Sequence, residues 1–238
     1  MSLKGWSALF TSDNLRFLLD GLWVTIWVTV LTGAISTVAG IAIGSVRSVT
    51  TGLAALPLTL YIEAFRNLPV LVLVFFLRFG LPATGVPVGS YPAAIVGLSL
   101  YGSALCAETF RAGVQSVGTG QGRATRAYGL TTFAAFRHVI FPQAWRIAMP
   151  AYVGQLIVLL QASTLVSAVG VVELTGAASV IYNRDFNPLE TFLLLAVIYL
   201  VLDNALSLAR RVIERRRSKR IRGDQRKSTA TAAVAQMG

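Results

Sequence analysis

Residues 21–46 read GLWVTIWVTVLTGAISTVAGIAIGSV, and no charged side chain interrupts them between Asp20 and Arg47. About 20 apolar residues in a helix are enough to cross the roughly 30 Å hydrocarbon core of a bilayer. The stretch is too long and too poorly flanked for a cleaved signal peptide. It therefore predicts a transmembrane helix, and the fold depends on how often such a stretch returns along the chain.

The composition of the whole chain also indicates a membrane protein. Of its 238 residues, 55% are hydrophobic and 13% are charged, and the mean hydropathy is +0.66. Soluble domains carry about 25% charged residues, so this chain has too few to cover a water-facing surface. The net charge of +11 comes largely from basic residues after the last apolar stretch, a pattern typical of a cytoplasmic membrane flank. We predict no nucleic-acid partner.

Further apolar stretches complete a prediction of five spans. Residues 53–79 carry Glu63, Arg66 and Pro69, and we interpret them as a broken or kinked span that faces protein or a wet cavity. The turn-rich sequence GLPATGVPVGSYP at 80–92 predicts a loop. The predicted fold class is all-α, a polytopic membrane protein with five transmembrane helices. The spans after the first are 53–79, 93–114, 147–172 and 188–209.

Basic residues in the connections predict the orientation. The connection 79–92 contains no Lys or Arg, whereas 112–146 contains four Arg and no acid. Positive charge marks the cytoplasmic side, so we predict the N-terminus outside and the C-terminus in the cytoplasm. The domains follow from this orientation. They are an extracytoplasmic segment 1–20, a five-helix domain 21–217 with the cytoplasmic connection 112–146, and a basic, disordered tail 218–238.

The cytoplasmic connection contains residues that typically begin and end helices, and they predict two short helices. One is expected over 120–128 and to end at Gly129, since glycine suits the left-handed position after a helix. A second is expected over 133–140, capped by Thr131 or its neighbour and stopped by Pro142. The pair would expose apolar side chains. It is either an interfacial helix on anionic lipid or a docking element for a partner protein.

No combination of side chains supports catalysis. The chain has one histidine, His138, and one cysteine, Cys106, so Ser-His, Cys-His and multi-histidine metal sites lack their partners. No glycine-rich turn ends in Lys-Ser or Lys-Thr, which excludes a phosphate-binding loop. We predict a protein that is not an enzyme and holds no metal and no cofactor.

Several ordered motifs resemble one family, the permease subunits of ABC importers for polar amino acids. Residues 120–150 (GQGRATRAYGLTTFAAFRHVIFPQAWRIAMP) are similar to the EAA loop of that family. Residues 61–71 (YIEAFRNLPVL) are similar to its YxExFRxxPxL segment, and 107–117 (AETFRAGVQSV) to its AExFRxGIxSI segment. Residues 166–174 (VSAVGVVEL) resemble the close of its fourth span. The resemblance extends over 18–217.

The resemblance implies an importer permease in the bacterial plasma (inner) membrane, in contact with membrane lipid. It implies three protein partners: ATP-binding cassette ATPase subunits that hydrolyse ATP, a second permease chain of the same or a similar kind, and an extracytoplasmic substrate-binding protein. Arg123 stands where the family usually has Glu. The implied ATPase-coupling residues are Gly120, Arg123, Ala124, Gly129, Phe133 and Phe136. The alternatives are a membrane scaffold or anchor whose loop binds a partner, and a passive channel with flux independent of ATP.

Charged side chains at membrane depth are costly and indicate a role. Glu63 and Arg66 are three residues apart, as are Glu108 and Arg111, so each pair shares a helix face. We interpret both pairs as structural ion pairs, with direct substrate contact as the alternative. Arg78 has no neighbouring acid. It either extends to the outer interface or holds a substrate carboxylate.

The fourth span contains a polar stretch of Gln161, Ala162, Ser163 and Thr164. Small and hydroxyl side chains allow close helix packing, or they line a path and hydrogen-bond a small zwitterion. The family commonly has an acid or amide where this chain has Ala162. With Arg78 added, this favours a neutral polar or acidic amino acid over a cationic one. The predicted substrate-binding residues are Arg78, Gln161, Ser163 and Thr164.

Overall fold

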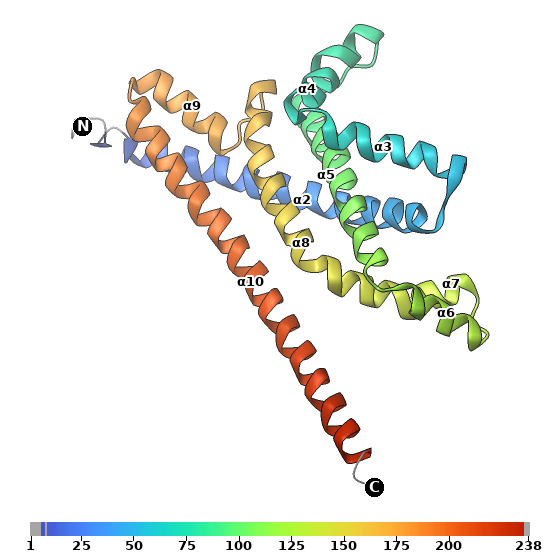
Figure 1. Ribbon diagram of the computed structural model, residues 1–238. Helices are drawn as coiled ribbons and strands as arrows, with labels where there is room; N and C mark the ends of the chain where they lie inside the picture. Colours follow the sequence, from blue (N-terminus) through green and yellow to red (C-terminus); the bar gives the residue numbers. More distant parts are fainter. Residues whose placement is uncertain (1–5, 8, 236–238) are drawn as a thin grey trace.

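The computed structural model describes residues 6–7 and 9–235, with side chains except at 119, 122, 123, 126 and from 216 on. The described residues form helices and no strand. Helical stretches long and apolar enough to cross a membrane are Ser12–Val49, Ser90–Gln115, Thr132–Val169 and Pro188–Arg215. Gly52–Asn67 and Val70–Thr84 add a bent pair with an angle of 103° between its halves. The predicted all-α class and the broken second span are confirmed (Figure 1).

The labelled helices carry the fold, and short 3-10 or π-helical turns extend or connect several of them. The helices in chain order are α2 (Ser12–Val49), α3 (Leu56–Asn67), α4 (Val70–Phe75), α5 (Ser90–Gln115), α6 (Thr119–Ala127), α7 (Thr132–Ala135), α8 (Phe141–Ala162), α9 (Leu174–Asp185) and α10 (Pro188–Ala235).

Helices α2 and α5 approach closely because glycines lie between them. A Cβ atom built on Gly44 would lie 2.5 Å from the carbonyl oxygen of Ala107. The same atom on Gly40 would lie 2.4 Å from Cβ of Cys106. Real side chains do not tolerate such distances, so only glycine permits this contact. Membrane helices use small residues in this way to bring their backbones together.

The bend in the second span lies between α3 and α4, at Leu68 and Pro69. Both residues have extended ψ angles, 132° and 127°. A residue before proline is pushed away from the helical region, and proline has no N–H to continue the helix. The Leu68-Pro69 sequence therefore causes the break that was predicted for the span 53–79.

The prediction that the second loop helix stops at Pro142 is wrong. Helix α7 continues through a π-helical turn at Phe136–Ile140 directly into α8. In this turn the N–H of Phe141 donates to the carbonyl oxygen of Phe136, five residues back. The wider turn relieves the clash that a proline ring makes with the preceding turn of an α-helix. One continuous helix thus runs from the loop into the fourth span.

Two segments are more helical than predicted. Helix α9 lies within 173–188, which the sequence predicted as a connection only. Helix α10 continues to Ala235 through most of the tail 218–238, for which disorder was predicted. Arg, Lys and Ala favour helix, and extending an existing helix needs no new nucleation. Residues 236–238 of the tail lie outside the described residues.

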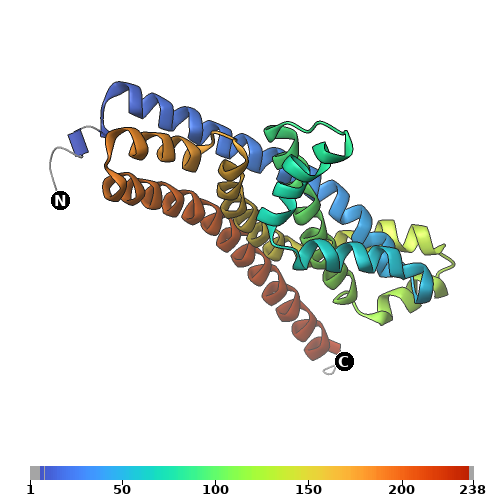
Figure 2. The same cartoon turned by 90° about the horizontal axis from the view of Figure 1, so that it is seen from above.

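The two ends of the molecule contain different elements. The start of α2 lies beside α9 and the start of α10 at one end, and α6 and α7 lie at the other (Figure 1). Figure 2 shows the same separation from above, with the C-terminal part of α10 pointing toward the end that contains α6 and α7. Between the ends, a buried apolar cluster joins four segments of the chain. Its members include Val28, Val74, Leu98, Leu159 and Val166.

Candidate translocation and coupling sites

Gly129 ends helix α6 as predicted, with a φ angle of +74°. The N–H of Leu130 donates to the carbonyl oxygen of Thr125 over 3.1 Å, which closes the helix end. A Cβ atom built on Gly129 meets nothing within 4 Å. The need for glycine here is therefore conformational, because L side chains rarely adopt this φ angle.

The loop exposes aromatic side chains. Of the two predicted coupling aromatics, Phe133 is strongly exposed and Phe136 is not. Tyr128 is 86% exposed and Phe133 is 73% exposed. Phe136 is partly buried, because its ring lies 6.2 Å from the ring of Phe141, which in turn lies 5.4 Å from that of Phe110. Phe133 is thus open to a partner, whereas Phe136 anchors the loop to the spans.

The remaining predicted coupling residues lie on α6. Gly120 and Ala124 are exposed, and nothing lies within 4 Å of a Cβ atom built on Gly120. The side chain of Arg123 lies outside the described part of the chain. The open surface on the loop is therefore formed by Gly120, Ala124, Tyr128 and Phe133. We call it the coupling surface.

The predicted substrate residues at the end of α8 and in the 3-10 helical turn Ser163–Val169 after it separate into two kinds. Gln161 reaches another helix, since its Nε2 donates to Oδ2 of Asp203 on α10 over 2.7 Å. Ser163 is fully buried and donates to the carbonyl oxygen of Leu160, and Thr164 donates to that of Gln161. Both hydroxyls are thus used within their own helix. Only Gln161 of the three is directed at another element.

Asp203, an acid within the apolar stretch 188–209, is a further candidate. Its Oδ2 accepts from Gln161, while Oδ1 is buried without a hydrogen-bond partner among the described residues. An unsatisfied buried polar atom costs about 1–3 kcal/mol, and more when charged. Oδ1 of Asp203 therefore has acceptor capacity that the described residues do not use.

Arg78 lies at a different place. Its Nε donates to Oγ of Ser90 over 3.2 Å and its Nη1 to the carbonyl oxygen of Val88 over 3.3 Å. The guanidinium also lies 5.3 Å from the ring centroid of Phe79. These contacts tie Arg78 to the connection before α5 and not to the Gln161–Asp203 pair.

Both acid–base pairs expected from their spacing are present. Arg66 lies 3.7 Å from Glu63, a loose contact. Arg111 holds Glu108 with two nitrogens, Nε at 2.8 Å from Oε2 and Nη2 close to Oε1. The second pair is bidentate and much the better formed. Arg66 and Glu108 also line one open cavity between α5 and α8.

A buried carboxylate that the sequence analysis missed connects three helices. Glu173 is fully buried and accepts from the N–H groups of Thr175 and Gly176, each over 2.9 Å. It also accepts from Oγ1 of Thr25 on α2 and from the hydroxyl of Tyr199 on α10. Burial raises the pKa of Glu173, and the hydrogen bonds oppose this. The only sequence signal was an acid directly before α9.

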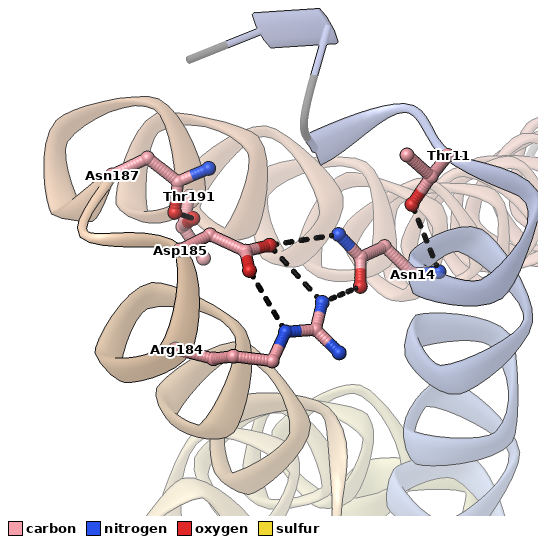
Figure 3. A network of polar contacts seen from close by, with 6 residues as sticks. All are labelled: Thr11, Asn14, Arg184, Asp185, Asn187 and Thr191. Carbon is pink, nitrogen blue, oxygen red and sulfur yellow. Dashed lines mark hydrogen bonds and ion pairs between the residues drawn. The ribbon is translucent and has the colours of Figure 1, made fainter.

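A second polar cluster lies at the same end, on the surface (Figure 3). Nε of Arg184 donates to Oδ1 of Asp185 over 2.8 Å, and Nδ2 of Asn14 donates to Oδ2 of Asp185 over 3.1 Å. Arg184 also donates to Oδ1 of Asn14. The hydrogen bond from Arg184 lowers the pKa of Asp185, with a further contribution from Asn14. This cluster fastens the end of α9 to the start of α2.

Comparison with known proteins identifies the family. Residues 36–219 match the family model described as "Binding-protein-dependent transport system inner membrane component". The chain belongs to this family. The permease is accordingly a multi-pass inner-membrane protein and a non-catalytic subunit, with ATP hydrolysis on a separate chain. The resemblance found in the motifs is confirmed.

Individual relatives cover almost the whole permease. It is 33% identical over 207 residues to the probable glutamine ABC transporter permease protein GlnM of Bacillus subtilis, covering 87% of this chain and 96% of the relative. It is 32% identical over 213 residues to the glutamine transport system permease protein GlnP of Escherichia coli, covering 89% and 96%.

A solved structure agrees with the fold of the permease. A chain of an amino acid ABC transporter, crystallised with histidines, has a TM-score of 0.82 and 31% identity, and the match covers 91% of this chain and 100% of that chain. The MetNI methionine transporter in an inward-facing conformation has a TM-score of 0.70 at 23% identity, which shows the fold alone.

Proposed function

We propose that the permease imports a neutral polar or acidic amino acid, driven by ATP hydrolysis on partner subunits and supplied by an extracytoplasmic binding protein. The observation that carries the proposal is the contact between Gln161 and Asp203. The free Oδ1 of Asp203 suits the α-ammonium group of an amino acid. The names of the glutamine relatives support the same class of substrate.

The preference against cationic amino acids rests on the number of acids available. Ala162 is buried, so the position where the family often has an acid or amide faces neighbouring side chains in this chain. Asp203 supplies one negative charge for the α-ammonium group, and the stretch 161–164 adds none. A second positive charge on the substrate would therefore lack a partner. Arg78 remains our candidate for the substrate carboxylate once it leaves Ser90.

The proposed orientation puts α9 outside and the coupling surface in the cytoplasm. The separation of these elements to opposite ends of the molecule supports it (Figure 2), as does the excess of Arg in 112–146. Helix α10 supports a lipid or second-permease contact, because only 6% of its most apolar window is buried within the chain.

The coupling step follows from the continuous helix. ATPase subunits that bind Phe133 and Tyr128 would move α7 when they close on ATP. Because Thr132–Val169 is one helical stretch, movement of α7 displaces Gln161 as well. The contact between Gln161 and Asp203 would then open or close with the nucleotide cycle, which alternates access to the substrate.

Competition for uptake tests the substrate class. Liposomes that contain the permease, its ATPase and its binding protein are supplied with labelled L-glutamine and a tenfold excess of a second amino acid. We expect L-glutamine or L-glutamate to compete and L-arginine or L-lysine to compete poorly. Asp203→Asn should reduce uptake, whereas the neighbouring control Asn204→Leu should not. Better competition by arginine or lysine would refute the preference.

A further inference from the structure

An open cavity of about 370 Å³ lies between the halves of α5 and α8 that adjoin the coupling surface. Its volume falls within the range of small-molecule sites. The polar part of its wall comes from three helices and from the end of α5. These lining residues are Arg66, Glu108, Thr109, Ser116 and Gln155.

The cavity brings together charges of both signs that retain bonding capacity. Arg66 pairs only with Glu63 in the described part of the chain, at 3.7 Å, and Glu63 is 56% exposed. The guanidinium of Arg66 can therefore take a carboxylate in a planar, two-bond contact. Each carboxylate oxygen of Glu108 accepts one hydrogen bond from Arg111. A carboxylate offers about four acceptor positions, so Glu108 can also accept from an ammonium group.

Uncharged groups in the cavity add hydrogen-bonding capacity. Nε2 of Gln155 donates to Oγ1 of Thr109 over 3.4 Å, a long bond that a ligand can replace. The lining also includes the small residues Ala112 and Ala151, which leave the space beside these polar groups open. The cavity is therefore polar enough to bind a small charged molecule and open enough to admit one.

We propose that this cavity binds a free α-amino acid as a zwitterion, reached from the cytoplasmic side. The carboxylate of the ligand pairs with Arg66, its ammonium group with Glu108, and its side chain lies toward Gln155. This inference rests on the proposed function, because it takes the transported class of molecule as the ligand. The site is separate from the Gln161–Asp203 pair, whose residues are not among its lining.

The position of the cavity links its occupancy to the coupling surface. Helix α8 forms one wall and continues into α7 through the π-helical turn. Beside the cavity, a Cβ atom on Gly113 would lie 2.8 Å from the carbonyl oxygen of Ala144, so α5 and α8 are in direct backbone contact. A change in the direction of α8 therefore alters the cavity. An amino acid bound there would favour one position of the coupling surface over another.

Calorimetric titration of L-glutamine into the purified permease–ATPase complex, without ATP or binding protein, tests the inference. N-acetyl-L-glutamine and L-glutamine α-amide each lack one of the two α-charges. We expect both to bind at least about tenfold more weakly than L-glutamine, because each lacks one of the two charge-assisted contacts. This arm does not depend on any variant folding correctly.

Variants then locate the site. Arg66→Gln removes the carboxylate partner and Ala151→Leu fills the cavity, and each should weaken L-glutamine binding at least about tenfold. Gln143→Leu is the matched control, because Gln143 lies on α8 outside the cavity and bonds the carbonyl oxygen of Val139. Its affinity should equal that of the unaltered chain.

The outcomes separate the two proposals. If L-glutamine affinity is unchanged in Arg66→Gln and Ala151→Leu but lost in Asp203→Asn, the cavity is not an amino-acid site. The proposed function would remain supported. Binding of N-acetyl-L-glutamine and L-glutamine α-amide with the same affinity as L-glutamine would also contradict the proposed site in the cavity. Absence of both L-glutamine binding and L-glutamine uptake would count against the proposed function itself. Uptake of L-glutamine without binding in the calorimetric titration would contradict the site in the cavity but not the proposed function.

Discussion

Two carboxylates of the permease, Glu173 and Glu108, differ in how completely their hydrogen bonds are satisfied. Glu173 is sealed from solvent, and its oxygens accept four hydrogen bonds from helices α2, α9 and α10. Within the part of the chain that the structure describes, Glu108 is hydrogen-bonded by Arg111 alone, and it faces an open cavity that it shares with Arg66. Full satisfaction fixes structure, whereas spare capacity beside empty space allows binding. We therefore expect the end with α9 to act as a fixed anchor and the end with α6 and α7 to respond to binding.

The largest expected effect comes from breaking the fixed cluster. Glu173→Ala removes the buried carboxylate that accepts from Thr25 and Tyr199 and caps α9. Four hydrogen bonds are lost together, so we expect a loss of about 3 kcal/mol in unfolding free energy. Thermal unfolding in detergent measures it. The control Glu214→Ala removes an exposed pair with Arg210 and should cost less than about 0.5 kcal/mol. Equal stability of the two variants would show that Glu173 is not an anchor.

The next effect concerns the responsive end. Gly129→Val forces a β-branched residue to a φ angle of +74°, a strain of about 1–3 kcal/mol confined to the loop. We expect ATP hydrolysis to continue while transport falls, because the coupling surface is displaced. Gly129→Asn is the matched control, since Asn tolerates this conformation. Measurement of ATPase activity and uptake in the same liposomes checks both. Normal coupled transport in Gly129→Val would contradict the account.

A smaller effect on stability is expected for Arg66→Gln, which distinguishes a role of Arg66 in ligand binding from a role in folding. The Arg66–Glu63 contact is loose and exposed, so Arg66→Gln should change the unfolding free energy by less than about 0.5 kcal/mol. Its effect should appear in L-glutamine affinity alone. If Arg66→Gln instead destabilises the permease as strongly as Glu173→Ala, then Arg66 is structural and the contrast between the two clusters fails.

The smallest effect concerns the surface cluster in Figure 3. The pKa of Asp185 is lowered by Arg184 and Asn14, so its carboxylate form is favoured in the folded state. The resulting stabilisation is present above the ordinary Asp pKa of about 3.9 and is lost as pH falls through the lower folded value. Asp185→Asn should reduce the acid dependence of unfolding in that window. An unchanged pH profile would show that the cluster does not fasten α9 to α2.

The spans could be predicted because lipid imposes a simple rule on sequence. A charge-free stretch such as 21–46 has no soluble alternative. Pro69 follows Leu68 in a segment where both residues leave the helical conformation, and its missing N–H favours a break there. Gly129 was equally clear, because its role depends on its own backbone. These features are local, and a local pattern is sufficient to predict them.

The features that the sequence did not predict depend on contacts between distant residues or on unusual local geometry. The Gln161–Asp203 contact joins residues 42 apart. Helix α9 begins at Glu173, whose capping geometry is held by Thr25 of α2, and capping by glutamate is not a common signal. Pro142 does not stop its helix because the π-helical turn accommodates it. Phe136 was placed on the docking face because the ring of Phe141 was not foreseen beneath it.

We propose that the permease couples ATP hydrolysis on its partner subunits to the import of an amino acid. The most direct measurement is uptake of labelled L-glutamine by liposomes that contain the permease with its ATPase, with the binding protein outside and ATP inside. We predict accumulation only when all three proteins and ATP are present. Equal uptake without ATP would indicate a passive channel, and no uptake by the intact, assembled complex would favour a membrane scaffold. Either result would contradict the account.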